Sequence, residues 1–160
     1  MSLERTLLIV KPDAVTAGHV DAILKMLDSC GFFLCKRKRR KLTESEVRKL
    51  YVEQREQKHF ANLLTFMISG ESELCELSGV AAVSRLSEII GPTSVAVARK
   101  LSPSSLRARY GTSATKNAVH GSASLEAAGT ELALLLPQRE TSLMSTSEYL
   151  TATVLPAVVS

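Results

Sequence analysis

The sequence contains no tryptophan, few aromatic residues of any kind and only three cysteines. Three is an odd number, and no two of the cysteines show the CxxC spacing of a zinc or redox site. We therefore expect Cys30, Cys35 and Cys75 to be buried, reduced thiols. A chain of 160 residues can bury a core large enough to fold without a disulfide or a structural metal ion.

Long apolar runs are also absent from the sequence. The longest run covers only a few residues, and residues 1–13 lack the basic start and sustained apolar core of a signal peptide. Hydrophobic residues make up 45% of the chain and charged residues 22%, an ordinary globular balance that argues against a disordered or fibrous protein. We therefore expect an intracellular protein that has no membrane partner.

A strong excess of one charge is missing as well, because the net charge is only +4 and most of it comes from the six cations of residues 36–41. Such a run could bind the phosphates of a nucleic acid. In a strand, however, alternate side chains point to opposite faces, so a solvated sheet edge or an acidic protein partner is the simpler explanation. Nucleic-acid binding is therefore the less favoured interpretation.

The spacing of apolar residues predicts strands that alternate with helices. A helical repeat predicts helices over residues 20–27, 60–67, 83–90 and 125–135, and short apolar stretches predict strands over 5–10, 32–35, 72–77 and 117–120. Thr43 and Glu46 have the spacing of a capping box that begins one more helix. Residues 91–107 carry serine and proline without a clear period and are expected to form a loop, while Ser122 is expected to cap the last helix. The predicted fold class is α/β, an α+β sandwich with helices covering a sheet.

One of the three histidines, His120, lies in the string Asn117-Ala-Val-His-Gly-Ser122, immediately before the last predicted helix. Because the N-terminal end of a helix attracts anions, this position suits a phosphate site. Most single histidines are packed or surface residues, so this local context alone does not decide the role of His120.

The surrounding motifs resemble those of the nucleoside diphosphate kinase family from Arg5 to Pro137. Residues 6–15, Thr-Leu-Leu-Ile-Val-Lys-Pro-Asp-Ala-Val, are similar to the opening strand and lysine loop of that family. Residues 117–122 are similar to its active-site signature, with Glu131 at the expected distance beyond. Two such strings in the right order make a specific match. The resemblance implies a ferredoxin-like four-stranded antiparallel sheet covered by helices.

The resemblance also implies the chemistry and the site residues. His120 would attack the γ-phosphate of a nucleoside triphosphate and form a phosphohistidine, which then phosphorylates a diphosphate. Glu131 would orient the histidine, through Ser122 in one arrangement, and Lys11 would reach the transferring phosphate. The resemblance further matches Tyr51, Thr93 and Arg107 to phosphate contacts, Asn117 to the ribose and Phe60 to the stacked base. Mg²⁺ would bridge phosphate oxygens rather than occupy a protein cage.

Without the resemblance, these residues have ordinary alternatives. Lys11 would be a surface lysine and Glu131 a solvated helix charge. Phe60 begins an apolar helical stripe and could simply belong to the core.

The sequence departs from the family pattern at three positions. Ser87 stands where the family places an arginine on the phosphates, and Arg85, about 200° around a helix, cannot replace it without a shift of the helix. One charge-assisted bond of about 1.5–3 kcal/mol would be lost, which weakens binding or turnover by about tenfold to a hundredfold. Ala114 replaces a larger aliphatic residue under the base, and Ala123 replaces an acidic residue.

Other features are most similar to the divergent ciliary branch of the family, which includes radial spoke protein 23. These features are residues 105–112, a longer loop after Gly91, and the tail, in which residues 149–156 resemble the opening of a docking and dimerisation motif. The second half of that motif is absent, so either the chain is truncated or the motif is degenerate. We predict a kinase domain over residues 1–137, followed by a linker and the start of a docking helix over residues 138–160.

Two functions are compatible with the resemblance. One is an active kinase that uses ATP and other nucleoside di- and triphosphates, in the cytoplasm and specifically in the axoneme of a cilium or flagellum. The other is a structural subunit of the radial spoke, with weak or no catalysis and with radial-spoke proteins as partners. Both imply a homo-oligomer, at least a dimer, although the longer loop argues against a hexamer. The retained site residues favour the first function, and Ser87 and the tail favour the second.

Overall fold

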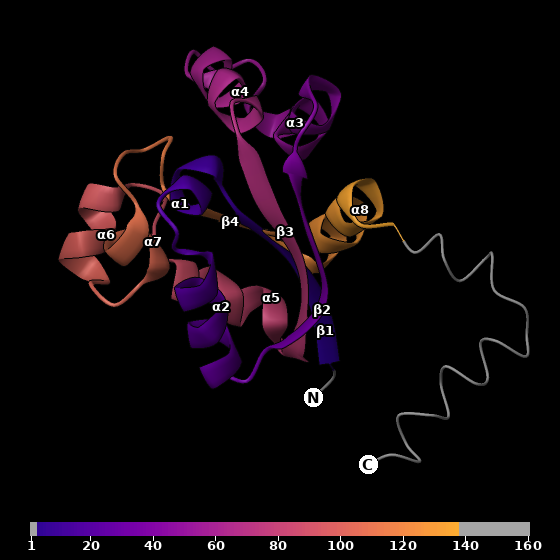
Figure 1. The fold of residues 1–160 in the computed structure, drawn as a ribbon, viewed down its shortest axis with the longest axis vertical. Helices are drawn as coiled ribbons and strands as arrows, with labels where there is room; N and C mark the ends of the chain where they lie inside the picture. The colour runs from indigo at the N-terminus through magenta and orange to yellow at the C-terminus, as the bar shows by residue number, and fades with distance from the viewer. Residues whose placement is uncertain (1–2, 138–160) are drawn as a thin grey trace, which may run out of the picture.

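An antiparallel sheet in the order β2-β3-β1-β4 organises residues 3–137, the part of the chain that this computed structural model describes (Figure 1). The strands are β1 (Leu3–Val10), β2 (Phe33–Lys41), β3 (Glu71–Val80) and β4 (Val119–Gly121). All three strand pairings are antiparallel, which confirms the expected ferredoxin-like sheet of four strands. Residues 138–160, predicted to be a linker and the start of a docking helix, lie outside the described residues.

Helices cover both faces of the sheet, because the apolar side chains of β1 alternate between the faces. Leu8 and Val10 belong to a core under α2 (Val20–Ser29) and α5 (Ala82–Ile90), with α1 (Pro12–Thr16) and α7 (Leu106–Tyr110) beside them. Leu7 and Ile9 belong to a second core under α3 (Glu44–Leu50), α4 (Phe60–Ile68) and α8 (Leu125–Leu135). A central strand buried on both faces explains the unbroken apolar run in this part of the sequence.

Several predicted elements are confirmed. The Thr43–Glu46 capping box is present in full and begins α3. The weakly indicated strand over residues 72–77 is β3, one of the two inner strands of the sheet. The second strand is longer than predicted, because β2 continues through all six cations of residues 36–41 at the edge of the sheet.

The prediction of a loop over residues 91–107 is wrong. This segment contains α6 (Val95–Leu101) and the start of α7. The serines that suggested a loop are helix caps: the hydroxyl of Ser94 accepts a hydrogen bond from the Val97 amide, and that of Ser105 from the Ala108 amide. Serine favours loops and helix N-caps alike, so the sequence alone could not separate the two.

Two smaller expectations also need correction. The cap of α8 is Ser124 rather than Ser122. Cys35 is exposed rather than buried, because it lies at a bulge in the edge strand β2, whereas Cys30 is half-buried and Cys75 is buried.

The short 3₁₀ helix η1 (Val52–Gln54) links α3 to the segment before α4. Among the described helices, none has the length and apolar character needed to cross a bilayer. The ends of β1 and β4, the start of α8 and the segment after α3 all border one cavity on the molecule.

Candidate active site

This cavity has a volume of about 680 Å³, within the usual range for a small-molecule site. It brings together residues from seven separate parts of the chain, and eight of the nine predicted site residues line it. These eight are Lys11, Tyr51, Thr93, Arg107, Asn117, His120, Ser122 and Glu131. The start of α8 also borders the cavity, so the positive end of the helix dipole faces the same space.

A chain of hydrogen bonds fixes the orientation of the His120 ring. Strand β4 pairs with β1 so that His120 lies opposite Ile9. Nε2 of His120 lies 3.0 Å from Oε1 of Glu131, and the hydroxyl of Ser122 donates to the same oxygen at 2.8 Å. The backbone amide of Leu7 in turn donates to the Ser122 hydroxyl at 3.3 Å. Glu131 therefore contacts the histidine directly, and Ser122 holds Glu131 to the sheet.

The bond to Glu131 determines the tautomer of the neutral imidazole. A carboxylate accepts hydrogen bonds, so Nε2 must carry the proton and Nδ1 must hold the free lone pair. No residue between positions 3 and 137 makes a hydrogen bond to Nδ1. The arrangement therefore presents one nucleophilic nitrogen to the cavity.

Lys11, at the end of β1, provides a buried ammonium group. Its Nζ donates to Oδ1 of Asn117 at 2.8 Å. Burial, and secondly the positive charge of Arg107, lower the pKa of Lys11 to about 7, an effect that Asp13 partly opposes. A cation that has been desolvated in this way gains most from a ligand that brings negative charge.

Tyr51 and Arg107 offer further hydrogen-bond donors. The Tyr51 hydroxyl and Nε of Arg107 are buried and have no hydrogen-bond partner among the described residues. Burial raises the pKa of Tyr51, so its hydroxyl stays protonated, and burial lowers the pKa of Arg107, which nonetheless stays cationic. Leaving a buried donor unpaired costs about 1–3 kcal/mol. An anion with several acceptor oxygens would satisfy both groups.

Asn117 is more constrained than the resemblance suggests. Its Nδ2 donates to the carbonyls of Thr93 and Ala114, each at 3.1 Å, while its Oδ1 accepts from Lys11. Both amide protons are therefore used to hold the neighbouring loops. A ribose hydroxyl could only donate to the remaining lone pair of Oδ1.

Phe60 is the one predicted site residue that does not line the cavity. It is 5% exposed and belongs to the core beneath α3 and α4, with the Arg48 guanidinium 5.7 Å above its ring. This placement matches the alternative that Phe60 begins an apolar helical stripe. The nearby His59 and Leu63 line the cavity instead.

The three positions that depart from the family pattern, Ser87, Ala114 and Ala123, all line the cavity. Arg85 does not, because its guanidinium donates to the backbone carbonyls of Cys30 and Val80 on the opposite side of α5. The charge absent at Ser87 is therefore not restored by Arg85.

Sequence reasoning missed a pair of residues that shape the segment before His120. Ala118 has a φ of 75°, a left-handed conformation that is uncommon outside glycine. Its amide donates to Oδ2 of Asp13 at 3.1 Å, and its carbonyl accepts from the Lys11 amide at 2.8 Å. Asp13 belongs to the lysine-loop motif, which was a usable signal, but nothing in the sequence marks Ala118 as strained.

Comparisons with known proteins agree with this geometry. A family model described as nucleoside diphosphate kinase matches residues 4–141. The chain is 41% identical over 135 residues to a nucleoside diphosphate kinase of Aquifex aeolicus, which covers 84% of this chain and 95% of that protein. It is also 41% identical over 138 residues to the thioredoxin domain-containing protein 3 homolog of Heliocidaris crassispina. That match covers 84% of this chain but only 16% of the much longer relative.

Solved structures share the fold. An orthorhombic crystal form of the Aquifex aeolicus nucleoside diphosphate kinase aligns with a TM-score of 0.80 and 38% identity, over 92% of this chain and 99% of that one. A halophilic nucleoside diphosphate kinase from Halobacterium salinarum in complex with CDP aligns with a TM-score of 0.81 and 27% identity, over 87% and 91% of the two chains.

Proposed function

Because the chain belongs to the nucleoside diphosphate kinase family, we propose that it transfers the γ-phosphate of a nucleoside triphosphate to a nucleoside diphosphate through a phosphohistidine at His120. The observation that carries this proposal is the bond between Nε2 of His120 and Glu131, 3.0 Å long. Of the two ring nitrogens of His120, it leaves Nδ1 with the free lone pair, in a cavity that also holds unpaired donors.

In the first half of the reaction, the Nδ1 lone pair of His120 forms a bond to the γ-phosphorus. The bond from that phosphorus to the β-phosphate oxygen breaks, and the nucleoside diphosphate leaves with those electrons. The phosphorylated ring becomes cationic, and the carboxylate of Glu131, bonded to the Nε2 proton, stabilises that charge. A second diphosphate then attacks the same phosphorus, and the ring returns to its neutral state.

Three groups that take no part in the hydrogen-bond chain of His120, Glu131 and Ser122 would stabilise the transferring phosphoryl group. Lys11 and Tyr51 are buried in the cavity wall and Arg107 is half-buried there, and all three can donate to its oxygens. Lys11 supplies a compact charge, Arg107 its unpaired Nε, and Tyr51 its unpaired hydroxyl. Charge that is fixed in advance in a desolvated site lowers the barrier for phosphoryl transfer.

The donor set of the cavity fits a magnesium ion that arrives with the nucleotide. The described residues contain no group of three or more side chains that could form a metal cage. The ion would therefore be held by phosphate oxygens, where it would offset their negative charge. The protein residues would contribute orientation and additional positive charge.

The decisive experiment is to incubate the protein with [γ-³²P]ATP and Mg²⁺ and to measure acid-labile, base-stable label on the chain. We expect stoichiometric label on His120 that ADP, GDP or CDP removes. His120→Ala should abolish the label. His59→Ala is the matched control, because His59 lines the same cavity but takes no part in the hydrogen-bond chain through Glu131 and Ser122.

A second candidate function is a structural subunit of a ciliary radial spoke that keeps the fold with little catalysis. Ser87 in the cavity wall supports it, because one phosphate-binding charge is missing there. Bound nucleotide without any phosphohistidine would favour this structural role and overturn the enzymatic one. The ciliary assignment itself depends on the resemblance of residues 105–112 and the tail, and retention of the protein in demembranated axonemes would test it. A homo-oligomer, at least a dimer, also belongs to the proposal, with sedimentation as its test.

A further inference from the structure

Asn117 and His120 both line the active-site cavity, although only two residues separate them in the chain. In a regular strand, side chains three positions apart point to opposite faces. The two residues between them, Ala118 and Val119, are fully buried and do not line the cavity. The chain must therefore turn sharply just before β4.

A tight turn centred on Ala118 makes this change of direction. The Val119 amide donates to the Asn117 carbonyl at 2.9 Å, and the φ of the intervening Ala118 is 75°. A bond across a single residue at positive φ belongs to the strained form of the γ-turn, which is rare. A strained backbone of this kind persists only where the surrounding structure enforces it.

The lysine loop holds both ends of the Ala118 residue. The Lys11 amide donates to the Ala118 carbonyl at 2.8 Å, and the Ala118 amide donates to Oδ2 of Asp13 at 3.1 Å. Nζ of Lys11 also donates to Oδ1 of Asn117. The other oxygen of Asp13, Oδ1, is buried and has no hydrogen-bond partner among the described residues. The restraint on the turn from Asp13 is therefore a single bond.

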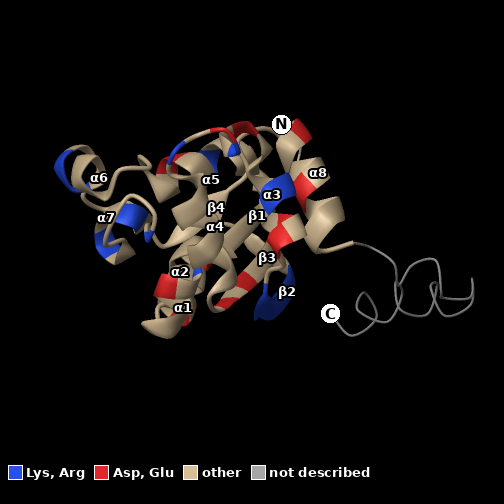
Figure 2. Ribbon diagram, turned by 90° about the horizontal axis from the view of Figure 1, so that it is seen from above, with Lys and Arg blue, Asp and Glu red and all other residues tan. Residues whose placement is uncertain are grey.

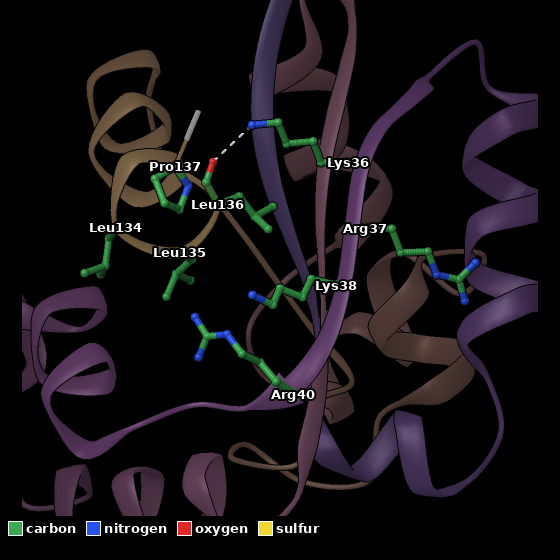
Figure 3. Close-up of a pocket in the computed structure, with 8 residues that line it drawn as sticks. All are labelled: Lys36, Arg37, Lys38, Arg40, Leu134, Leu135, Leu136 and Pro137. Carbon is green, nitrogen blue, oxygen red and sulfur yellow. Dashed lines mark hydrogen bonds between the residues drawn. The ribbon is translucent and has the colours of Figure 1, made fainter. Parts of the chain in front are cut away.

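Asp13 differs from the carboxylates that pair with surface cations. Figure 2 shows the blue cations of β2 beside red residues of β3, where Glu73 binds both Arg37 and Arg39. Other cations of residues 36–41 border a second cavity, of about 720 Å³, between β2 and the end of α8 (Figure 3). Within residues 3–137, Asp13 forms no ion pair and lines neither cavity. Neither surface pairing nor direct contact with a ligand explains it.

Stabilisation of a helix start explains Asp13 only in part. It lies in the first turn of α1, where the helix dipole favours a negative charge. Asp21 has the same place in the first turn of α2, yet its side chain is 94% exposed. Asp13 is half-buried, and burial raises the pKa of its carboxyl, a rise that the bond from the Ala118 amide and then the charge of Lys11 oppose. The dipole does not require this burial, whereas the bond to Ala118 does.

We propose that Asp13 is a positioning residue for phosphoryl transfer, a role that rests on the proposed function. Its Oδ2 holds the turn of residues 117–119 in the left-handed form that directs both Asn117 and His120 into one cavity. Without that bond, residue 118 relaxes toward a negative φ, and the His120 ring moves relative to Glu131. Asp13 thus acts through the backbone and touches neither the ring nor the cavity.

The test measures, on the full chain, the single-turnover rate of His120 phosphorylation by [γ-³²P]ATP and the affinity for ATP. Asp13→Ala removes the acceptor and should lower the rate at saturating ATP by about tenfold to a hundredfold, because small misplacements of a reacting group are costly. Asp13→Asn keeps an acceptor oxygen for the Ala118 amide and should hold the rate within about threefold. The lost charge, which favours the ammonium form of Lys11, should still weaken ATP binding in Asp13→Asn.

A glycine at position 118 provides the rescue. Glycine adopts a positive φ without strain, so the turn no longer needs the carboxylate. Asp13→Ala combined with Ala118→Gly should therefore react within about threefold of the rate of Ala118→Gly alone. A crystal structure of Asp13→Ala gives a readout that does not depend on activity, and residue 118 should have a negative φ there.

Asp21→Ala is the matched control, because it removes an acidic residue from the first turn of α2 and should leave the rate unchanged. The proposal is overturned if Asp13→Asn is as slow as Asp13→Ala, if glycine fails to restore the rate, or if φ stays near 75° in Asp13→Ala. Should Asp13→Ala not fold, a folded and active double variant supports the proposal, and an unfolded or slow one overturns it. A wild-type chain that takes up no label would refute the proposed function instead, and the φ of residue 118 would still test the role of Asp13.

Discussion

One oxygen of Glu131 accepts hydrogen bonds from both His120 and Ser122, at 3.0 Å and 2.8 Å. The imidazole is held by a carboxylate eleven residues further along the chain, and that carboxylate is held by a hydroxyl anchored to the backbone of β1. Because each bond limits the freedom of the next group, the ring cannot rotate without breaking its bond to a carboxylate that is itself held in place. The position of the reactive nitrogen thus depends on three side chains and one amide.

The first prediction concerns the charge on Glu131. Glu131→Gln keeps the shape of the side chain but removes the negative charge that stabilises the phosphorylated ring. A hydrogen bond to a charged group contributes about 1.5–3 kcal/mol, so the rate of His120 phosphorylation should fall by about tenfold to a hundredfold. Single-turnover measurement with [γ-³²P]ATP gives this rate.

Glu126→Gln provides the control for the first prediction. Glu126 also lies on α8 and lines the same cavity, but His120 bonds to Glu131 and forms no hydrogen bond or ion pair with Glu126. Its replacement should leave the rate within about twofold, an effect below about 0.5 kcal/mol. Equal rates for the two variants would remove Glu131 from the mechanism.

The second prediction concerns the coupling between Ser122 and Glu131. Ser122→Ala should slow phosphorylation by severalfold, because it releases the carboxylate that orients the ring. Once Glu131 is replaced by Gln, the same serine change should have little further effect, since residues of one network are not additive. A double-mutant cycle on the single-turnover rate measures this coupling, and strictly additive effects would show that Ser122 acts elsewhere.

The sheet and the parts of the site that are close together in sequence could be predicted from the sequence. The apolar run of β1, the capping box at Thr43 and the string around His120 each depend on neighbouring residues only. The segment from 91 to 107 could not, because Ser94 and Ser105 have the same local preferences in loops and at helix starts.

Properties that depend on tertiary contacts could not be predicted from the sequence either. Nothing local distinguishes a Phe60 that lines a cavity from one that packs in a core. The left-handed backbone of Ala118 is imposed by Asp13 and Lys11, more than a hundred residues away. The pairing of Arg37, Arg39 and Arg40 with acidic residues likewise decides which cations of the basic run are available to a ligand.

The third prediction tests the position that departs from the family pattern. Ser87 lines the cavity from α5, so Ser87→Arg would place a guanidinium near bound phosphates. One added charge-assisted bond of about 1.5–3 kcal/mol should tighten ADP binding by about tenfold to a hundredfold. Isothermal titration calorimetry at fixed ionic strength gives the affinity.

Ser84→Arg serves as the control for the third prediction. Ser84 lies on the exposed side of the same helix, three residues earlier, and does not line the cavity. It adds the same net charge, so any general electrostatic attraction of nucleotide appears in both variants. Equal affinities for the two would mean that phosphates do not approach Ser87.

The final prediction follows from the lowered pKa of Lys11. Burial, and then the charge of Arg107, bring this pKa to about 7 when the cavity is empty. At pH 8 roughly nine in ten molecules then carry neutral Lys11. Nucleotide phosphates raise the pKa again, because an adjacent negative charge favours the ammonium form. ADP binding at pH 8 should therefore take up close to one proton, whereas binding at pH 6, where Lys11 is already protonated, should take up almost none from this group. Calorimetry in buffers of different ionisation enthalpy measures the uptake.

Lys11→Met should bind ADP more weakly and should lose the uptake at pH 8, while Lys49→Met, a change at another lysine of the cavity wall, should keep it. Proton uptake that persists in Lys11→Met would mean that another group titrates on binding and that Lys11 does not contact the phosphates.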